Sequence, residues 1–137
     1  MKKRLFVLLT VMVLLVTMAA TAFAAKPTAT LSSKYKNQTV KAGKTVTFWF
    51  KLDSGSYEKK DDAFRAKLGV LIVKDGATKG AANWVWTGKQ TYKLRAKIQK
   101  AAEAGKYTVK YTTYYRSKEA AAWKKAKTQS TKFTVKK

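Results

Sequence analysis

The chain has 137 residues, with 30 lysines and arginines against 7 aspartates and glutamates, a formal net charge of +23 at pH 7. It contains no histidine and no cysteine. That composition excludes thiol nucleophiles, disulfides, the usual general base at neutral pH and zinc sites of the common kind. Because net charge on this scale opposes folding through self-repulsion, it indicates an anionic partner; the plainer alternative is solubility alone.

The N-terminal segment 1–24 has the three parts of a secretory signal peptide. The start MKKR is basic, residues 5–16 are apolar, and Ala22-Phe23-Ala24 is a small-residue cleavage site. Loss of Lys2, Lys3 and Arg4 with this segment would lower the net charge from +23 to +20 and leave one domain, residues 25–137. The alternative is an uncleaved membrane anchor. We expect a secreted protein, extracellular or held non-covalently at a bacterial cell wall.

Apolar and polar residues alternate with the period of a half-buried strand. Residues 45–52, 91–99 and 131–137 have this pattern, and residues 29–33 and 38–42 have it more weakly. The alternation predicts antiparallel strands with one buried and one solvated face.

Residues 67–75 form instead a continuous apolar run, as expected of a central strand that is covered on both faces. The charged stretch 54–64 is predicted to be the longest loop, and residues 117–127 a connection with one helical turn. We therefore expect an all-β fold, an antiparallel β-sandwich of about seven strands.

The segment EAGKYTV (103–109) resembles the approach to strand F in immunoglobulin-like domains, where the tyrosine corner lies. The resemblance implies structural roles for Glu103, Gly105 and Tyr107, with the Tyr107 hydroxyl bonded to nearby backbone. VKAGKTVTFWF (40–50) resembles the glycine turn into strand B of bacterial immunoglobulin-like modules. Together they imply an immunoglobulin-like sandwich; a fibronectin-like or other seven-stranded sandwich is the alternative.

The acidic residues form no catalytic pattern. Asp61 and Asp62 are adjacent in a lysine-rich loop, and we interpret them as solvated partners of Lys59 and Lys60. The stretch 53–62 does not match a calcium-binding loop. We therefore expect no enzymatic activity, no bound metal and no cofactor.

Basic and aromatic residues on the solvated sides of the strands are our candidate polyanion-binding residues. The strands at 45–52 and 91–99 are neighbours in such a sandwich, so their outward residues share a surface where like charges would face each other across the strands. The segment 105–117 contributes a second set. The candidates are Trp49, Lys51, Lys93, Arg95, Lys97, Lys110, Tyr114, Arg116 and Lys132. The alternative is a solvated face without a ligand.

Trp84 and Trp86 share one face of the segment 82–89 and form a candidate aromatic platform for a sugar ring, a base or a partner side chain. The alternative is that both cap the sandwich interior. Trp123 is expected to pin its own loop against the sandwich.

These features predict a secreted, cationic, non-enzymatic module that binds extracellular polyanions: teichoic acid, acidic polysaccharide, or DNA without sequence specificity. Two alternatives remain: an antimicrobial antagonist attracted to anionic membranes, and a domain that binds or inhibits an acidic protein. The lysines are spread over strands and do not follow an amphipathic helix, which disfavours membrane insertion.

Overall fold

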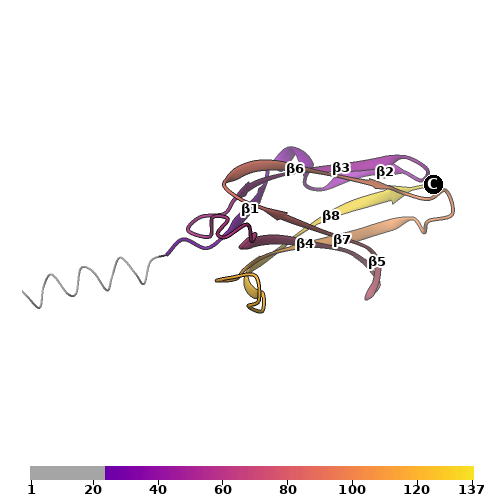
Figure 1. The fold of residues 1–137 in the computed structure, drawn as a ribbon. Coiled ribbons are helices and arrows are strands. Elements are labelled where there is room, and N and C mark those ends of the chain that lie inside the picture. The colour runs from indigo at the N-terminus through magenta and orange to yellow at the C-terminus, as the bar shows by residue number, and fades with distance from the viewer. Residues whose placement is uncertain (1–23) are drawn as a thin grey trace, which may run out of the picture.

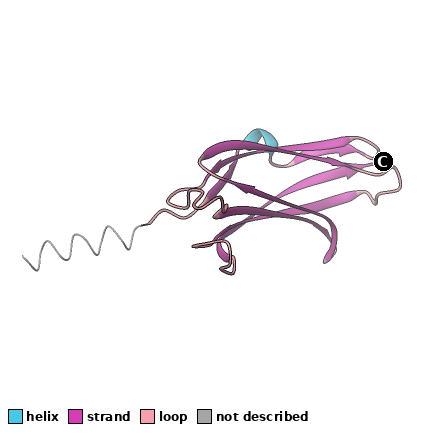
Figure 2. Ribbon diagram, viewed as in Figure 1, coloured by secondary structure: helices cyan, strands magenta, loops and turns pink. Residues whose placement is uncertain are grey.

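The computed structural model describes residues 24–137, which form two packed β-sheets (Figures 1 and 2). The predicted signal peptide lies, apart from Ala24, outside the described residues. The elements are β1 (Thr28–Leu31), η1 (Ser33–Tyr35), β2 (Gln38–Lys41), β3 (Thr45–Asp53), β4 (Ala66–Lys74), β5 (Ala77–Trp86), β6 (Lys89–Lys97), β7 (Gly105–Tyr115) and β8 (Lys124–Lys136). In residues 24–137, no helix is long and apolar enough to cross a membrane.

The strands divide between a three-stranded sheet A, of order β1-β3-β6, and a five-stranded sheet B, of order β2-β8-β7-β4-β5. All pairings are antiparallel except that of β2 with β8, which is parallel. Figure 1 shows β3 and β6 in one layer above β4 and β7 in the other. The predicted all-β sandwich is confirmed.

The core lies between the sheets and is built from the alternate residues that the sequence pattern assigns to it. In β3 the inward side chains, from Val46 to Leu52, are at most 3% exposed. Phe48 packs against Phe133 of the opposite sheet in a tilted arrangement, with ring centres 6.0 Å apart. Each large apolar side chain buried in this way contributes about 1.5–3 kcal/mol to folding. Without cysteines, this packing holds the sandwich together.

The outer face of β4 is not covered, so the prediction of a strand buried on both faces is wrong. Leu68 and Val70 point into the core, whereas Leu71 on the other side is 43% exposed. The strand is central only within its sheet, between β7 and β5. The described residues form only two layers, so no third layer covers the outer face of β4.

The connection between β7 and β8 contains no helical turn of the predicted kind. Ala121 donates one backbone hydrogen bond of 3.1 Å to the Lys118 carbonyl, and β8 begins at Lys124. Strand β5 was not predicted from the sequence. Its first half, around Gly80 and Ala81, lacks the β-branched and aromatic residues that favour strands.

The loop between β3 and β4 is tied to the turn that joins β5 and β6. The Ser54 side chain is fully buried; its Oγ accepts a 2.9 Å hydrogen bond from the Gly88 amide and donates one of 3.2 Å to Glu58 Oε1. Glu58 Oε2 accepts a further bond of 2.9 Å from Thr87 Oγ1. Glu58 therefore serves to close this end of the sandwich.

The same loop holds the first described residues. Ala25 N donates to Ser56 Oγ at 3.0 Å, and Ser56 N donates to the Ala25 carbonyl at 2.8 Å. Gly55 has a positive φ of 61°, and a Cβ there would lie 2.5 Å from the Ala25 oxygen. Only glycine fits between the loop and the N-terminal segment.

Candidate functional site

The outer face of sheet A carries an exposed tryptophan among basic side chains. Trp49 lies opposite Lys93 in the β3–β6 pairing and is 40% exposed. The Lys93 ammonium lies 5.0 Å from the centre of the Trp49 ring, within the range of a cation–π interaction. Trp49 alternates with the buried residues of β3, and Lys93 alternates with the less exposed residues of β6. We define face A as Trp49, Lys51, Lys89, Lys93, Arg95 and Lys97.

The register corrects one expectation about this face. Arg95 lies opposite Thr47, and Lys97 lies opposite Thr45. Like charges therefore do not face each other across the strands; they follow one another along β6. That strand is an edge of sheet A. Charged residues on an edge strand also prevent edge-to-edge aggregation, which is the competing explanation for this row.

A shallow depression of about 460 Å³ lies beside these residues. It is lined by Thr28, Thr30, Lys51, Leu52, Asp53, Lys89, Gln90 and Thr91. Lysine ammonium and threonine hydroxyl groups are donors for phosphate, carboxylate or sugar oxygens. The sequence does not assign Lys89 to this face, because it lies outside the segment 91–99, and places it only at the rim of the candidate tryptophan platform.

The outer face of sheet B is wider and carries seven lysines. Lys110 lies opposite Ser130 and Lys132 opposite Thr108, so these two of the four candidates predicted for this sheet share one surface. We define face B as Tyr114 with Lys41, Lys67, Lys106, Lys110, Lys125, Lys132 and Lys136. The predicted set lacked five of these lysines. For Lys136 the signal was present, since it alternates with buried Phe133 and Val135.

Tyr114 lies at one end of face B in a cluster of rings and cations. Its ring packs over Gly69, where a Cβ would lie 3.1 Å from Tyr114 Cε2. The Lys67 ammonium lies 4.8 Å from the centre of the Tyr114 ring and 4.9 Å from that of Trp123. The loop before β8 is thereby held against the sheet, in the manner expected for Trp123.

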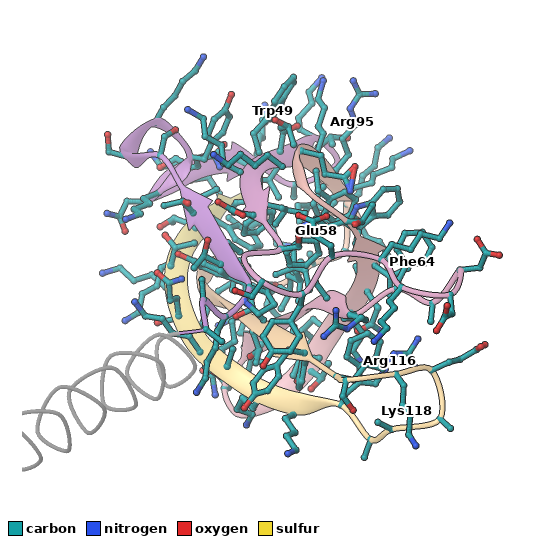
Figure 3. All side chains as sticks on the ribbon, turned by 60° about the vertical axis from the view of Figure 1, so that its left-hand side comes forward. Trp49, Glu58, Phe64, Arg95, Arg116 and Lys118 are labelled. Atoms are coloured by element: carbon teal, nitrogen blue, oxygen red, sulfur yellow. The ribbon has the colours of Figure 1, made fainter. Side chains whose placement is uncertain are left out.

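Arg116 was predicted to contact ligand, but its guanidinium group binds the protein's own loops. It donates 2.8 Å and 3.0 Å hydrogen bonds to the carbonyls of Phe64 and Glu119, and it lies 4.1 Å from the centre of the Trp123 ring. A side chain so occupied is a structural clamp. Figure 3 shows Trp49 and Arg95 projecting from one side of the molecule and Arg116 lying toward the opposite side.

The proposed platform of Trp84 and Trp86 does not exist as a pair. Trp86 is fully buried, opposite the small side chain of Ala66, which leaves room for the indole. Trp84 is 40% exposed and stacks on Tyr92 of the other sheet, with ring centres 4.8 Å apart and planes 6° apart. The two tryptophans thus close the interior on the side of β5 and β6, as in the alternative.

The three residues of the predicted tyrosine corner lie together before and within β7. Tyr107 Oη donates a 2.7 Å hydrogen bond to the Glu103 carbonyl, and Gly105 has a φ of 125°. The Tyr107 ring stacks on Phe133 with centres 5.2 Å apart. The three residues connect β6 to β7 and take no part in either basic face.

Carboxylates are nearly absent from both faces. All seven acids are described; six lie in connections between strands, and Asp53 ends β3. Within residues 24–137 the ion pairs shorter than 4 Å are Lys59–Asp62, at 3.8 Å, and Lys74–Asp75, at 3.1 Å. In residues 24–137 no lysine of face A or B forms an ion pair shorter than 4 Å; the one acid placed on a strand, Asp53, lies opposite Lys89 at the end of face A.

The described residues contain no group of three or more carboxylate, imidazole or thiol side chains that would hold a metal ion. Asp61 and Asp62 are both exposed, and Asp62 pairs with Lys59. This geometry matches solvated loop residues better than a hydrolytic pair.

No protein-family model and no curated protein matches the chain. Among solved structures, the chain is similar to the superoxide reductase (neelaredoxin) from Ignicoccus hospitalis, at 11% sequence identity and a TM-score of 0.43. The similarity covers 82% of this chain and 81% of that one. A similarity at this level carries no functional information.

Proposed function

We propose that the protein is a secreted, non-enzymatic module that binds extracellular polyanions through exposed lysines on its sheet faces. The observation that carries the proposal is the separation of charge: lysines occupy both outer faces, whereas six of seven acids lie in the connections. An anionic polymer lying on either face meets donors and almost no repelling carboxylate. The preponderance of lysine over arginine favours recognition of point charges over a fixed bidentate geometry.

We also propose that the sandwich is immunoglobulin-like. The strand order supports it: β1, β3 and β6 take the places of strands A, B and E, while β4, β7 and β8 take those of C, F and G, with β5 beside C. The hydrogen bond from Tyr107 to the Glu103 carbonyl supports the same assignment. Such folds serve many functions, so the assignment does not itself choose a ligand.

Retention in a salt series tests the polyanion proposal. The protein is applied to immobilised teichoic acid, duplex DNA, a neutral polysaccharide and anionic vesicles. Binding to the first two should fall linearly with the logarithm of salt concentration, by about 0.9 log units per neutralised phosphate on duplex DNA. The neutral polysaccharide is the control and should not retain the protein.

Binding to teichoic acid and DNA that persists unchanged in 0.5 M salt would contradict the electrostatic mechanism. Retention on vesicles with release of their contents would instead favour a membrane antagonist. Capture of one acidic protein at salt concentrations that release the polymers would favour the protein-binding alternative. The four columns, together with a pull-down from culture medium for the acidic protein, therefore separate the three functions.

A further inference from the structure

The basic residues lie on both faces of a two-layer molecule, and this geometry has a consequence beyond binding itself. Face A belongs to sheet A and face B to sheet B, the two layers of the sandwich in Figure 1, so their outer surfaces point in opposite directions. We propose that the module holds two anionic polymer chains at once, one on each face, and thereby cross-links them. This inference rests on the proposed polyanion binding.

The two faces are far enough apart to act independently. Packed sheets lie about 10 Å apart, so polymers on opposite outer faces are separated by roughly 20 Å of protein. The Debye length at physiological salt is about 8 Å. Each polymer is therefore neutralised by the lysines beneath it and is largely screened from the other.

Two of the routes from one face to the other are not uniformly basic. The connections at the end where the N-terminal segment docks hold Glu58, Asp61, Asp62 and Glu119 among Lys59, Lys60 and Lys118. On the side between the edges of β5 and β6 lies a cleft of about 460 Å³, where apolar and small residues such as Ile72, Gly80 and Ala96 lie beside Lys79 and Lys97. The opposite end of the sandwich carries Lys44, Lys100 and Lys137, so a test of two separate faces needs a probe too stiff to bend around that end.

A stiff probe makes the two faces separable by experiment. Strands of 9 to 13 residues extend about 30–40 Å, which matches a duplex of roughly 12 base pairs. Duplex DNA has a persistence length of about 150 base pairs, so such a probe cannot wrap around the molecule. The duplex is immobilised on beads, saturated with protein and washed, and a second, fluorescent duplex of the same length is added. Captured fluorescence measures cross-linking.

Three variants that lose the same number of charges test whether capture of the second duplex depends on which face is basic or only on the net charge. The face A variant carries Lys93→Gln, Arg95→Gln and Lys97→Gln, and the face B variant carries Lys106→Gln, Lys110→Gln and Lys132→Gln. The distributed control carries Lys34→Gln, Lys60→Gln and Lys118→Gln, three exposed lysines that belong to neither face: Lys34 lies in η1 and the other two lie in connections between strands. Loss of three phosphate contacts lowers the affinity of one face by about 150-fold at 0.15 M salt.

The wild-type protein should capture the second duplex. Each single-face variant should still bind the first duplex but capture at least about tenfold less of the second, while the distributed control stays within about twofold of wild type. Equal capture by all three variants would overturn the inference, because cross-linking would then follow net charge. A wild type that binds the first duplex and captures no second would overturn it too, yet leave polyanion binding intact. A wild type that binds neither would overturn both proposals.

Discussion

Trp49 and Trp84 provide a matched pair of perturbations. Both indoles are 40% exposed. Trp49 lies on face A against the Lys93 ammonium, whereas Trp84 lies at the rim of the sandwich interior against Tyr92. Both substitutions remove an indole of equal exposure. Trp49→Ala removes it from the proposed binding face, and Trp84→Ala removes it from a packing contact. We expect Trp49→Ala to weaken ligand binding and Trp84→Ala to reduce stability.

The expected magnitudes follow from the contacts. A base or sugar ring stacked on Trp49 contributes about 1–3 kcal/mol, so Trp49→Ala should weaken binding about 5- to 150-fold. Its cost to folding is about 1–2 kcal/mol, because an exposed cation–π contact supplies only about 0.5–1 kcal/mol of it. Trp84→Ala loses an aligned aromatic stack worth about 0.5–1.5 kcal/mol beyond its buried area, for a total of about 2–3 kcal/mol.

Fluorescence anisotropy with a labelled single-stranded oligonucleotide, over a salt series, separates stacking from charge. Trp49→Ala removes no cation. It should therefore lower the affinity equally at every salt concentration, without changing the slope of log affinity against log salt concentration. Lys93→Gln should lower the slope by about 0.7, the value for one phosphate of a single strand. The reasoning fails if Trp49→Ala changes the affinity by less than about twofold at every salt concentration, or if Trp84→Ala weakens binding equally.

Three further changes test the fold. Tyr107→Phe keeps the ring but removes the 2.7 Å bond to the Glu103 carbonyl, and urea unfolding should show a loss of about 0.5–1.5 kcal/mol; unchanged stability would contradict the corner. Ser54→Ala removes a fully buried hydroxyl with two hydrogen bonds and should cost about 1–3 kcal/mol, clearly more than Ser56→Ala at an exposed position of the same loop. Burial raises the pKa of Tyr111, so its stabilisation is complete below the unfolded-state value of about 10 and is lost as pH rises through the folded-state value. Tyr111→Phe should therefore flatten the alkaline fall of the urea midpoint, and a parallel fall in both proteins would refute this.

The alternation of apolar and polar residues was enough to predict the sandwich and most of face A. A period of two assigns neighbours such as Phe48 and Trp49 to opposite faces of a strand. The folded structure keeps this assignment because the apolar face must be buried. The prediction failed at positions where a local irregularity or a long-range contact decides whether a side chain is buried or exposed. A β-bulge in β8 skips Ala126, so that Thr113 pairs with Lys127 and Tyr114 pairs with Lys125. The alternation that runs back from Lys132 therefore does not assign Lys125 to face B, whereas Tyr114 lies outward as its own strand predicts.

Long-range contacts account for the remaining errors. Arg116 alternates as an outward residue, yet the loop carbonyl of Phe64, 52 positions away in sequence, takes its guanidinium group. Trp86 is indistinguishable from Trp84 in the sequence pattern, but only Trp86 has Ala66 opposite to make room for it. Neither relation is encoded in the spacing of nearby residues.

If the leader proposed from the sequence is cut after Ala24, the docking of Ala25 against Gly55 and Ser56 implies an order of events. A peptidase that cuts after Ala24 needs an extended and accessible chain around that bond. In the folded molecule the adjacent residue is held by two hydrogen bonds and lies in contact with Gly55. We therefore expect removal of the proposed leader at this point to precede closure of the loop over Ala25. On this proposal the new α-ammonium group keeps the bond to Ser56 that the peptide nitrogen makes, so cleavage leaves this contact in place.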